Sequence, residues 1–192
     1  MKFKLAKTFY RVMLWWIVLW SKTYRFFWQP KRKYVKSPLE TNHSPVTAWN
    51  KIRVLEYRKD DWKVLRDVFN RPEHVQMSIN CKKSFGVQLD GQMDCDDYAV
   101  WCANVLARKW HPMILCVIYK YKDGDLSGHA VCLAQNHQTG KYFHVGNWGV
   151  WGPYDSFNQA ISSILSKRSI LIGWSLFSPD LKLLKWSKKL PK

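Results

Sequence analysis

Cys95 is suited to nucleophilic chemistry, because it stands where a turn-rich loop passes into a helix. The residues Gly86–Gln92 before it are rich in turn formers, whereas apolar residues recur at helical spacing from Cys95 to Leu106. Asp94 is the predicted N-cap of this helix. The exposed N–H groups and the dipole at a helix start favour a thiolate, so Cys95 is a candidate for attack on a carbonyl carbon, provided a histidine can reach it.

His129 is the predicted base, and Asn147 is the predicted partner of its ring. The run Ser127–Ala134 has the pattern of a strand entered through a glycine, with His129 at its start. A turn then leads into a second predicted strand over Tyr142–Asn147. Residues near the open ends of two antiparallel strands are neighbours. Asn147 can therefore orient the His129 ring, which completes a Cys-His-Asn arrangement with Cys95.

The order of these elements resembles that of the transglutaminase-like and papain-like cysteine hydrolases. The string Asp94-Cys95-Asp96-Asp97-Tyr98-Ala99 is similar to the nucleophile motif of the bacterial transglutaminase-like cysteine proteinases, where Gly-Asp-Cys-Glu-Asp-Tyr-Ala is typical. The resemblance extends from Trp62 to Trp151. Met93 stands where that family has glycine, and Gly146-Asn147 stands where it has an Asp-Asn pair. Papain-like members use asparagine as the third residue of the triad, and Asp155 is the alternative here.

The resemblance implies a thiol hydrolase or acyl transferase that acts on an amide bond. Its substrate would be a peptide, an isopeptide or a cell-wall peptide crosslink. A bacterial or phage origin is implied as well, and a phage virion is one location where such a protein would be found.

Several further side chains are expected to support this chemistry. The Cys95 N–H and the Gln88 side chain are the predicted oxyanion donors, with Gln92 as the other candidate. Trp148 and Trp151 are expected to shield the histidine or line the substrate groove, and core packing is the equal alternative for both. His144 is expected to face the opposite side of the sheet, so it is given no role. No metal site and no cofactor are predicted, since Asp90–Asp97 lacks the alternating ligands of a calcium loop.

Composition indicates a folded, strongly basic chain. Its 192 residues include 12 Trp, and its net charge of +17 predicts anionic partners such as nucleic acid, an acidic membrane surface or an acidic polymer. The 5 cysteines are an odd number without a CxxC pair, which favours an intracellular reducing compartment.

The N-terminal residues form a basic, Trp-rich arm. No acidic residue occurs from Met1 to Leu39, and the run Val12–Trp20 is apolar all round. A helix of this length covers about 14 Å, which is too short to cross a bilayer. No small-residue cleavage site follows, so a signal peptide is not favoured. The arm is therefore predicted either to lie on an anionic membrane or to pack on protein, and Pro30–Pro45 reads as a linker.

The predicted fold is α+β, with the nucleophile helix packed on an antiparallel sheet of about four strands. We expect an arm and linker over 1–45, the hydrolase domain over 46–180 and a basic tail over 181–192. The other predicted elements are helices over 60–69, 72–79 and 157–165, strands over 113–119 and 169–177, and a loop over 149–153.

A rival hypothesis treats the chain as a structural or binding protein without catalytic activity. In that case residues 1–36 and 181–192 would hold an anionic membrane, nucleic acid or a larger assembly. The high charge and the tryptophan content fit this hypothesis as well as they fit an enzyme.

Overall fold

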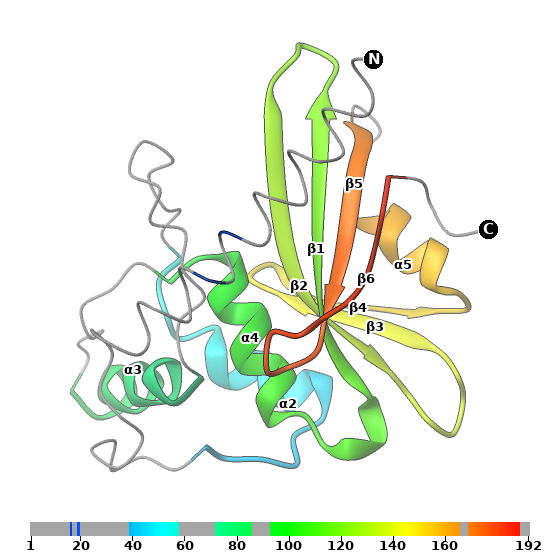
Figure 1. Ribbon diagram of the computed structural model, residues 1–192. Helices are drawn as coiled ribbons and strands as arrows, with labels where there is room; N and C mark the ends of the chain where they lie inside the picture. The colour runs from blue at the N-terminus through cyan, green and yellow to red at the C-terminus, as the bar shows by residue number, and fades with distance from the viewer. Residues whose placement is uncertain are drawn as a thin grey trace.

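The computed structural model describes residues 39–57, 72–85, 93–165 and 169–188, together with Trp16 and Leu19. These ranges hold four α-helices and a six-stranded antiparallel sheet (Figure 1). The predicted α+β class with an antiparallel sheet is confirmed, and the sheet has more strands than expected. The predicted helix over 60–69, Gln88, Gln92 and most of the basic arm lie outside the described residues.

The sheet has the strand order β4-β3-β2-β1-β5-β6. Its strands are β1 (Pro112–Tyr121), β2 (Leu126–Gln135), β3 (Tyr142–Gly146), β4 (Gly149–Tyr154), β5 (Ser169–Phe177) and β6 (Leu183–Ser187). A long hairpin of β1 and β2 forms the centre, where Val117 lies opposite His129. β2 pairs with β3 only from Cys132 onward, so the first half of β2 has its strand neighbour on the β1 side.

Two of these strands were not predicted. The Trp- and Gly-rich segment expected to be a loop is β4, whose Val150 lies opposite Val145 of β3. Gly152 fits there because its φ is +127° and a Cβ would come within 2.7 Å of the Tyr142 carbonyl oxygen. The segment expected to be a basic tail contains β6, which pairs with β5. In both segments, pairing with a neighbouring strand stabilises a strand that the residue composition does not favour.

The helix that carries the predicted nucleophile, α4 (Cys95–Val105), is buried along nearly its whole length. It packs on β1 and β2, where β2 offers the small side chains Ala130, Cys132 and Ala134. Small residues on the strands let the helix approach the sheet closely. The helix stops before the predicted end near residue 110, because Leu106 is extended and bridges to His43. A short 3₁₀ helix, η3 (Arg108–Trp110), then leads into β1.

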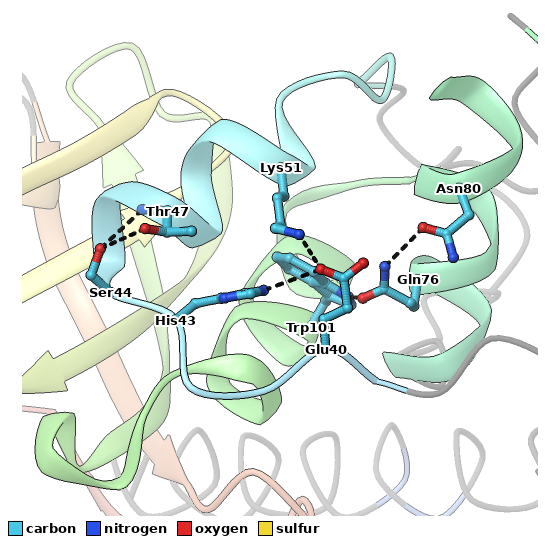
Figure 2. A network of polar contacts seen from close by, with 8 residues as sticks. All are labelled: Glu40, His43, Ser44, Thr47, Lys51, Gln76, Asn80 and Trp101. Carbon is cyan, nitrogen blue, oxygen red and sulfur yellow. Dashed lines mark hydrogen bonds and ion pairs between the residues drawn. The ribbon is translucent and has the colours of Figure 1, made fainter. Parts of the chain in front are cut away.

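Two further helices pack beside α4. These are α2 (Pro45–Ile52), which was not predicted and begins at the last residue of the expected linker, and α3 (Pro72–Phe85), which continues beyond its predicted end. α2 also contacts β3 and β4 of the sheet. Trp101 of α4 donates from Nε1 to Gln76 Oε1 of α3 at 3.2 Å, and Gln76 donates in turn to Asn80 at 3.1 Å (Figure 2).

Other polar contacts reinforce the same group of helices. The Tyr98 hydroxyl of α4 donates to the Leu55 carbonyl at 2.8 Å. An ion pair joins Lys51 of α2 to Glu40 (Figure 2). On the C-terminal side, Asn104 of α4 donates to the Pro179 carbonyl at 3.2 Å, in the segment that enters β6.

The opposite face of the sheet is covered by α5 (Phe157–Ile164). Its N-cap is Ser156, whose side chain accepts from the Gln159 backbone N–H. Ala160 and Ile161 pack against Val131 and other residues of a second apolar cluster. No helix in the described ranges has the length and apolar composition needed to cross a membrane.

We expect Trp101→Phe to lower the free energy of unfolding by about 2–3 kcal/mol. The change leaves Gln76 without its indole donor in a fully buried position and opens a gap beside it. Urea denaturation of the two proteins would measure the difference. Trp151→Phe is the matched control, because Trp151 is 51% exposed and its loss should change the unfolding free energy by less than about 0.5 kcal/mol.

Candidate active site

Cys95 is the first residue of α4, as the sequence predicted. Asp94 is the N-cap, and its side chain accepts from the Asp96 backbone N–H at 3.2 Å. The thiol is half-buried and takes part in no disulfide. Asp96 and Asp97 lie buried in the first turn. The helix start favours a thiolate here, and the neighbouring carboxylates oppose it.

The same residues are the group within the described ranges that could hold a metal ion. One ligand atom from each of Asp94, Cys95 and Asp96 lies within 4.8 Å of the others. Capping of α4 already explains the position of Asp94, and carboxylates in a first turn are common. The arrangement is therefore accounted for without an ion, and the absence of a metal stays a prediction.

His129 lies on β2 with its ring on the α5 face of the sheet. Strand alternation places it on the face of Val131, whereas Ala130 and Cys132 face α4. The ring is 7% exposed and stacks on Trp148, with ring centroids 4.4 Å apart and planes at 16°. Burial lowers the pKa of His129 to about 4, and the Asp94 carboxylate acts in the opposite direction. The ring is therefore neutral near pH 7 and has a lone pair for a proton.

The start of α4 and the His129 ring approach from different faces of β2. The Asp94 carboxylate is nevertheless close enough to raise the pKa of the ring. The pKa of Tyr119, which shares the α5 face, is raised mainly by burial and by a hydrogen bond with Tyr121, and Cys95 adds to the rise. At the level of His129, β2 is paired with β1 and not with β3. Contact between the Cys95 thiol and the His129 ring must therefore be made past the edge of β2 that β3 leaves unpaired at this level.

Asn147 lies in the turn between β3 and β4, and its neighbours Gly146 and Trp148 approach the His129 ring. A Cβ on the preceding Gly146 would lie 3.7 Å from His129 Nε2 and 3.1 Å from Val131 Cγ1. A side chain there would press on Val131, so this position beside the ring favours glycine. The Asn147 Oδ1 atom is buried and has no hydrogen-bond partner. The predicted bond to His129 is thus not formed, and its acceptor is vacant.

Asp155, the alternative third member, forms an ion pair with Lys141 at 3.0 Å and is exposed. It is not among the described residues that line the cavity beside His129. Gln88, the predicted oxyanion donor, lies outside the described residues. The structure therefore brings His129 close to the Asn147 turn and leaves Asp155 elsewhere.

A cavity of about 320 Å³ opens beside His129 on the α5 face. Trp148 and Trp151 both line it, and they are 63% and 51% exposed. Tyr119 and Tyr121 contribute from β1, and Ser163 contributes from α5. Of the two predicted roles for these tryptophans, the structure agrees with the lining of a cavity and not with packing in the core.

His144 also lines this cavity, contrary to expectation. The prediction that it faces away counted strand alternation from Asn147, but Asn147 lies beyond the end of β3. The pairing of His144 with Leu133 puts it on the α5 face. Its Nε2 lies 2.9 Å from Ser163 Oγ and 3.3 Å from the Tyr154 hydroxyl. Burial, with a smaller contribution from the neighbouring His129, lowers the pKa of His144 to about 4.

No family model matches the chain, and no curated protein sequence is significantly similar to it.

The two cavity histidines make stability depend on pH. Each has a folded pKa of about 4 against an ordinary 6.5, so between these values the unfolded chain binds more protons. We expect the free energy of unfolding to be highest above pH 6.5 and to fall as the pH drops toward 4, by up to about 3 kcal/mol per ring. Urea denaturation at a series of pH values would measure the slope.

His144→Gln tests the assignment of this slope. Glutamine keeps a neutral polar side chain but has no titrating ring, so the slope between pH 6.5 and 4 should fall by about half. An unchanged slope in the variant would contradict the burial of a neutral His144.

Proposed function

We propose that the chain is a thiol hydrolase or acyl transferase acting on an amide bond, with Cys95 as nucleophile, His129 as base and Asn147 as the acceptor that holds the ring. One observation carries the proposal. Asp94 caps the helix that begins with Cys95, and the charge of its carboxylate reaches the His129 ring. The residue next to Cys95 in sequence therefore lies within electrostatic range of a histidine that is distant in sequence, and this supports the pairing that the resemblance to papain-like hydrolases implies.

The chemistry follows from the roles of these groups. The neutral His129 ring takes the thiol proton, and the Cys95 sulfur forms a bond to the substrate carbonyl carbon. The N–H groups at the start of α4 stabilise the resulting oxyanion, to which Gln88 would add a donor. The imidazolium then gives its proton to the amine nitrogen as the C–N bond breaks, which leaves a thioester. Water, or an amine in the case of transfer, attacks this thioester and releases the thiol.

Burial makes a positive charge on His129 costly, and two features offset this cost. The Asp94 carboxylate already raises the pKa of the ring. The vacant Asn147 Oδ1 would accept an N–H from the imidazolium. A buried carbonyl without a partner costs about 1–3 kcal/mol, so forming this bond when the ring gains its proton stabilises the charged form.

Peptide, isopeptide and cell-wall peptide bonds all provide the amide carbonyl that this mechanism needs. No metal or cofactor has a step in it. The resemblance to the bacterial proteinases points to a bacterial or phage setting for the activity.

Site-specific alkylation of Cys95 by iodoacetamide tests the pairing with His129. At pH 6.5 we expect Cys95 to react at least about tenfold faster than the half-buried Cys81 in the same molecule, and His129→Ala to remove that advantage. Peptide mapping by mass spectrometry separates the two sites. His144→Ala is the matched control, because it removes a ring of similar burial from the same cavity and should change the Cys95 rate less than about twofold.

Equal effects of the two histidine substitutions would mean that the cavity is merely disturbed, and would count against a specific pair. If Cys95 reacts no faster than Cys81 in the wild type, the hydrolase proposal fails.

The second candidate function is binding of a polyanion by the basic segments, without catalysis. The described part of the C-terminal segment favours it, because Lys182 and Lys185 are exposed on and beside the edge strand β6, with Lys188 following. Leu183 and Leu184 are exposed between them. This edge of the sheet would bind an anionic membrane surface, nucleic acid or a larger assembly.

Neutralising these lysines should weaken the dependence of DNA binding on salt. Each phosphate contact contributes about −0.9 to the slope of log K against log salt, so the triple change of Lys182, Lys185 and Lys188 to Gln should flatten the slope by up to about 3. Filter binding at several salt concentrations measures it. The matched control removes the same charge elsewhere, with Lys120, Lys122 and Lys141 changed to Gln. Equal slopes in the two variants would show that only net charge matters.

A further inference from the structure

The cavity beside His129 has walls that the proposed chemistry does not use. Its sides come from β1, β2, the β3–β4 turn and α5, and its volume of about 320 Å³ is at the small end of the range for ligand sites. It therefore has room for one bulky side chain together with the backbone that carries it.

The cavity is an environment of low polarity. Burial lowers the pKa of both His129 and His144 to about 4, which means that a charged group is poorly solvated there. The Nε2 atom of His144 is already engaged with Ser163 and Tyr154, so this ring serves as a fixed, neutral wall. A charged side chain entering the cavity would lose its hydration, whereas an uncharged one would gain from burial.

Aromatic rings at the cavity present their faces and edges to a ligand. Trp148 lies flat on His129 with one face, and 63% of the residue is exposed. Tyr119 and Tyr121 meet edge to face, with centroids 5.3 Å apart and planes at 89°. Stacked and edge-to-face contacts are the arrangements that aromatic pairs prefer, so a planar ring fits these walls better than an aliphatic chain does.

The position of the cavity relative to the catalytic residues gives the orientation of the ligand. The helix that carries Cys95 packs on one face of β2, and the cavity lies with His129 on the other. In the proposed reaction the sulfur bonds to the acyl group, and His129 gives its proton to the departing amine. The part of the substrate that extends past His129 is therefore the amine side.

We infer that the cavity binds an uncharged aromatic side chain on the residue that supplies the amine of the scissile bond. This inference rests on the proposed function for its orientation, whereas binding of the aromatic ring itself depends only on the cavity.

The test measures binding, not turnover, in the full chain carrying Cys95→Ser. The probes are the end-capped peptides N-acetyl-Gly-Phe-amide and N-acetyl-Gly-Gly-amide, which are neutral, and N-acetyl-Gly-Lys-amide, which carries a charged side chain. They are titrated while the indole N–H signals of Trp148 and Trp151 are followed by NMR. We expect the phenylalanine peptide to shift the Trp148 signal and to bind at least tenfold more tightly than the other two. N-acetyl-Phe-Gly-amide, with the ring on the acyl side, should bind more weakly than N-acetyl-Gly-Phe-amide.

Two matched substitutions locate the binding site. Leu165→Trp adds bulk to a half-buried residue that lines the cavity, and Ile170→Trp makes the same kind of change at a residue that is 58% exposed and does not line it. We expect the first to weaken binding of the phenylalanine peptide at least tenfold and the second to change it less than twofold. If Leu165→Trp does not fold, the shift of the Trp148 signal in the Cys95→Ser chain decides alone.

The outcomes separate this inference from the proposed function. Equal affinity for the phenylalanine and glycine peptides, or equal effects of the two tryptophan substitutions, would overturn the inference even if Cys95 proves reactive. Selective binding of the phenylalanine peptide together with an unreactive Cys95 would keep the aromatic site and reject the hydrolase.

Discussion

The packing of α4 on the central hairpin is the contact on which the rest of the structure depends. One surface of the helix meets the small residues Ala130 and Cys132 of β2, and another is tied to α3 through Trp101. Apolar burial of this kind stabilises by about 1.5–3 kcal/mol for each large side chain. Because the helix is buried nearly all round, it cannot slide or rotate without exposing apolar surface. Its first residue, Cys95, therefore has a fixed position relative to β2.

The start of α4 concentrates buried carboxylates in an otherwise basic protein. Asp94, Asp96 and Asp97 are buried at the N-terminus of α4, although the chain carries a net charge of +17. The N–H groups of the helix stabilise these carboxylates. Burial holds His129 neutral, and Asp94 makes a proton on that ring less costly. The same carboxylate thus caps the helix and adjusts the histidine, so the fold and the proposed chemistry share one residue.

Much of this arrangement could be predicted from the sequence, and the failures have identifiable causes. The start of α4, its Asp94 cap and the strand Ser169–Phe177 follow from apolar spacing and capping rules, which are local. β4 and β6 were missed because their own residues, rich in Gly and Trp in β4 and part of a basic segment in β6, do not favour a strand, and pairing with β3 and β5 stabilises them. α2 was missed because Pro45 reads as part of a linker, although proline suits a first helical turn. His144 was misplaced because alternation was counted across the end of β3. The vacant acceptor on Asn147 could not be predicted, since it depends on how the turn packs.

The C-terminal strand has a consequence for how the basic segments can be studied. β6 pairs with β5, and the segment entering it is joined to α4 through the bond from Asn104 to the Pro179 carbonyl. Truncating the chain at residue 180 would uncover the β5 edge and remove Leu181, which is buried in the same apolar cluster as α4. A deletion would therefore confound loss of charge with damage to the fold, and an exposed β5 edge would invite aggregation. Shortening the chain changes its charge and its fold together, whereas replacing side chains changes the charge and keeps the strand.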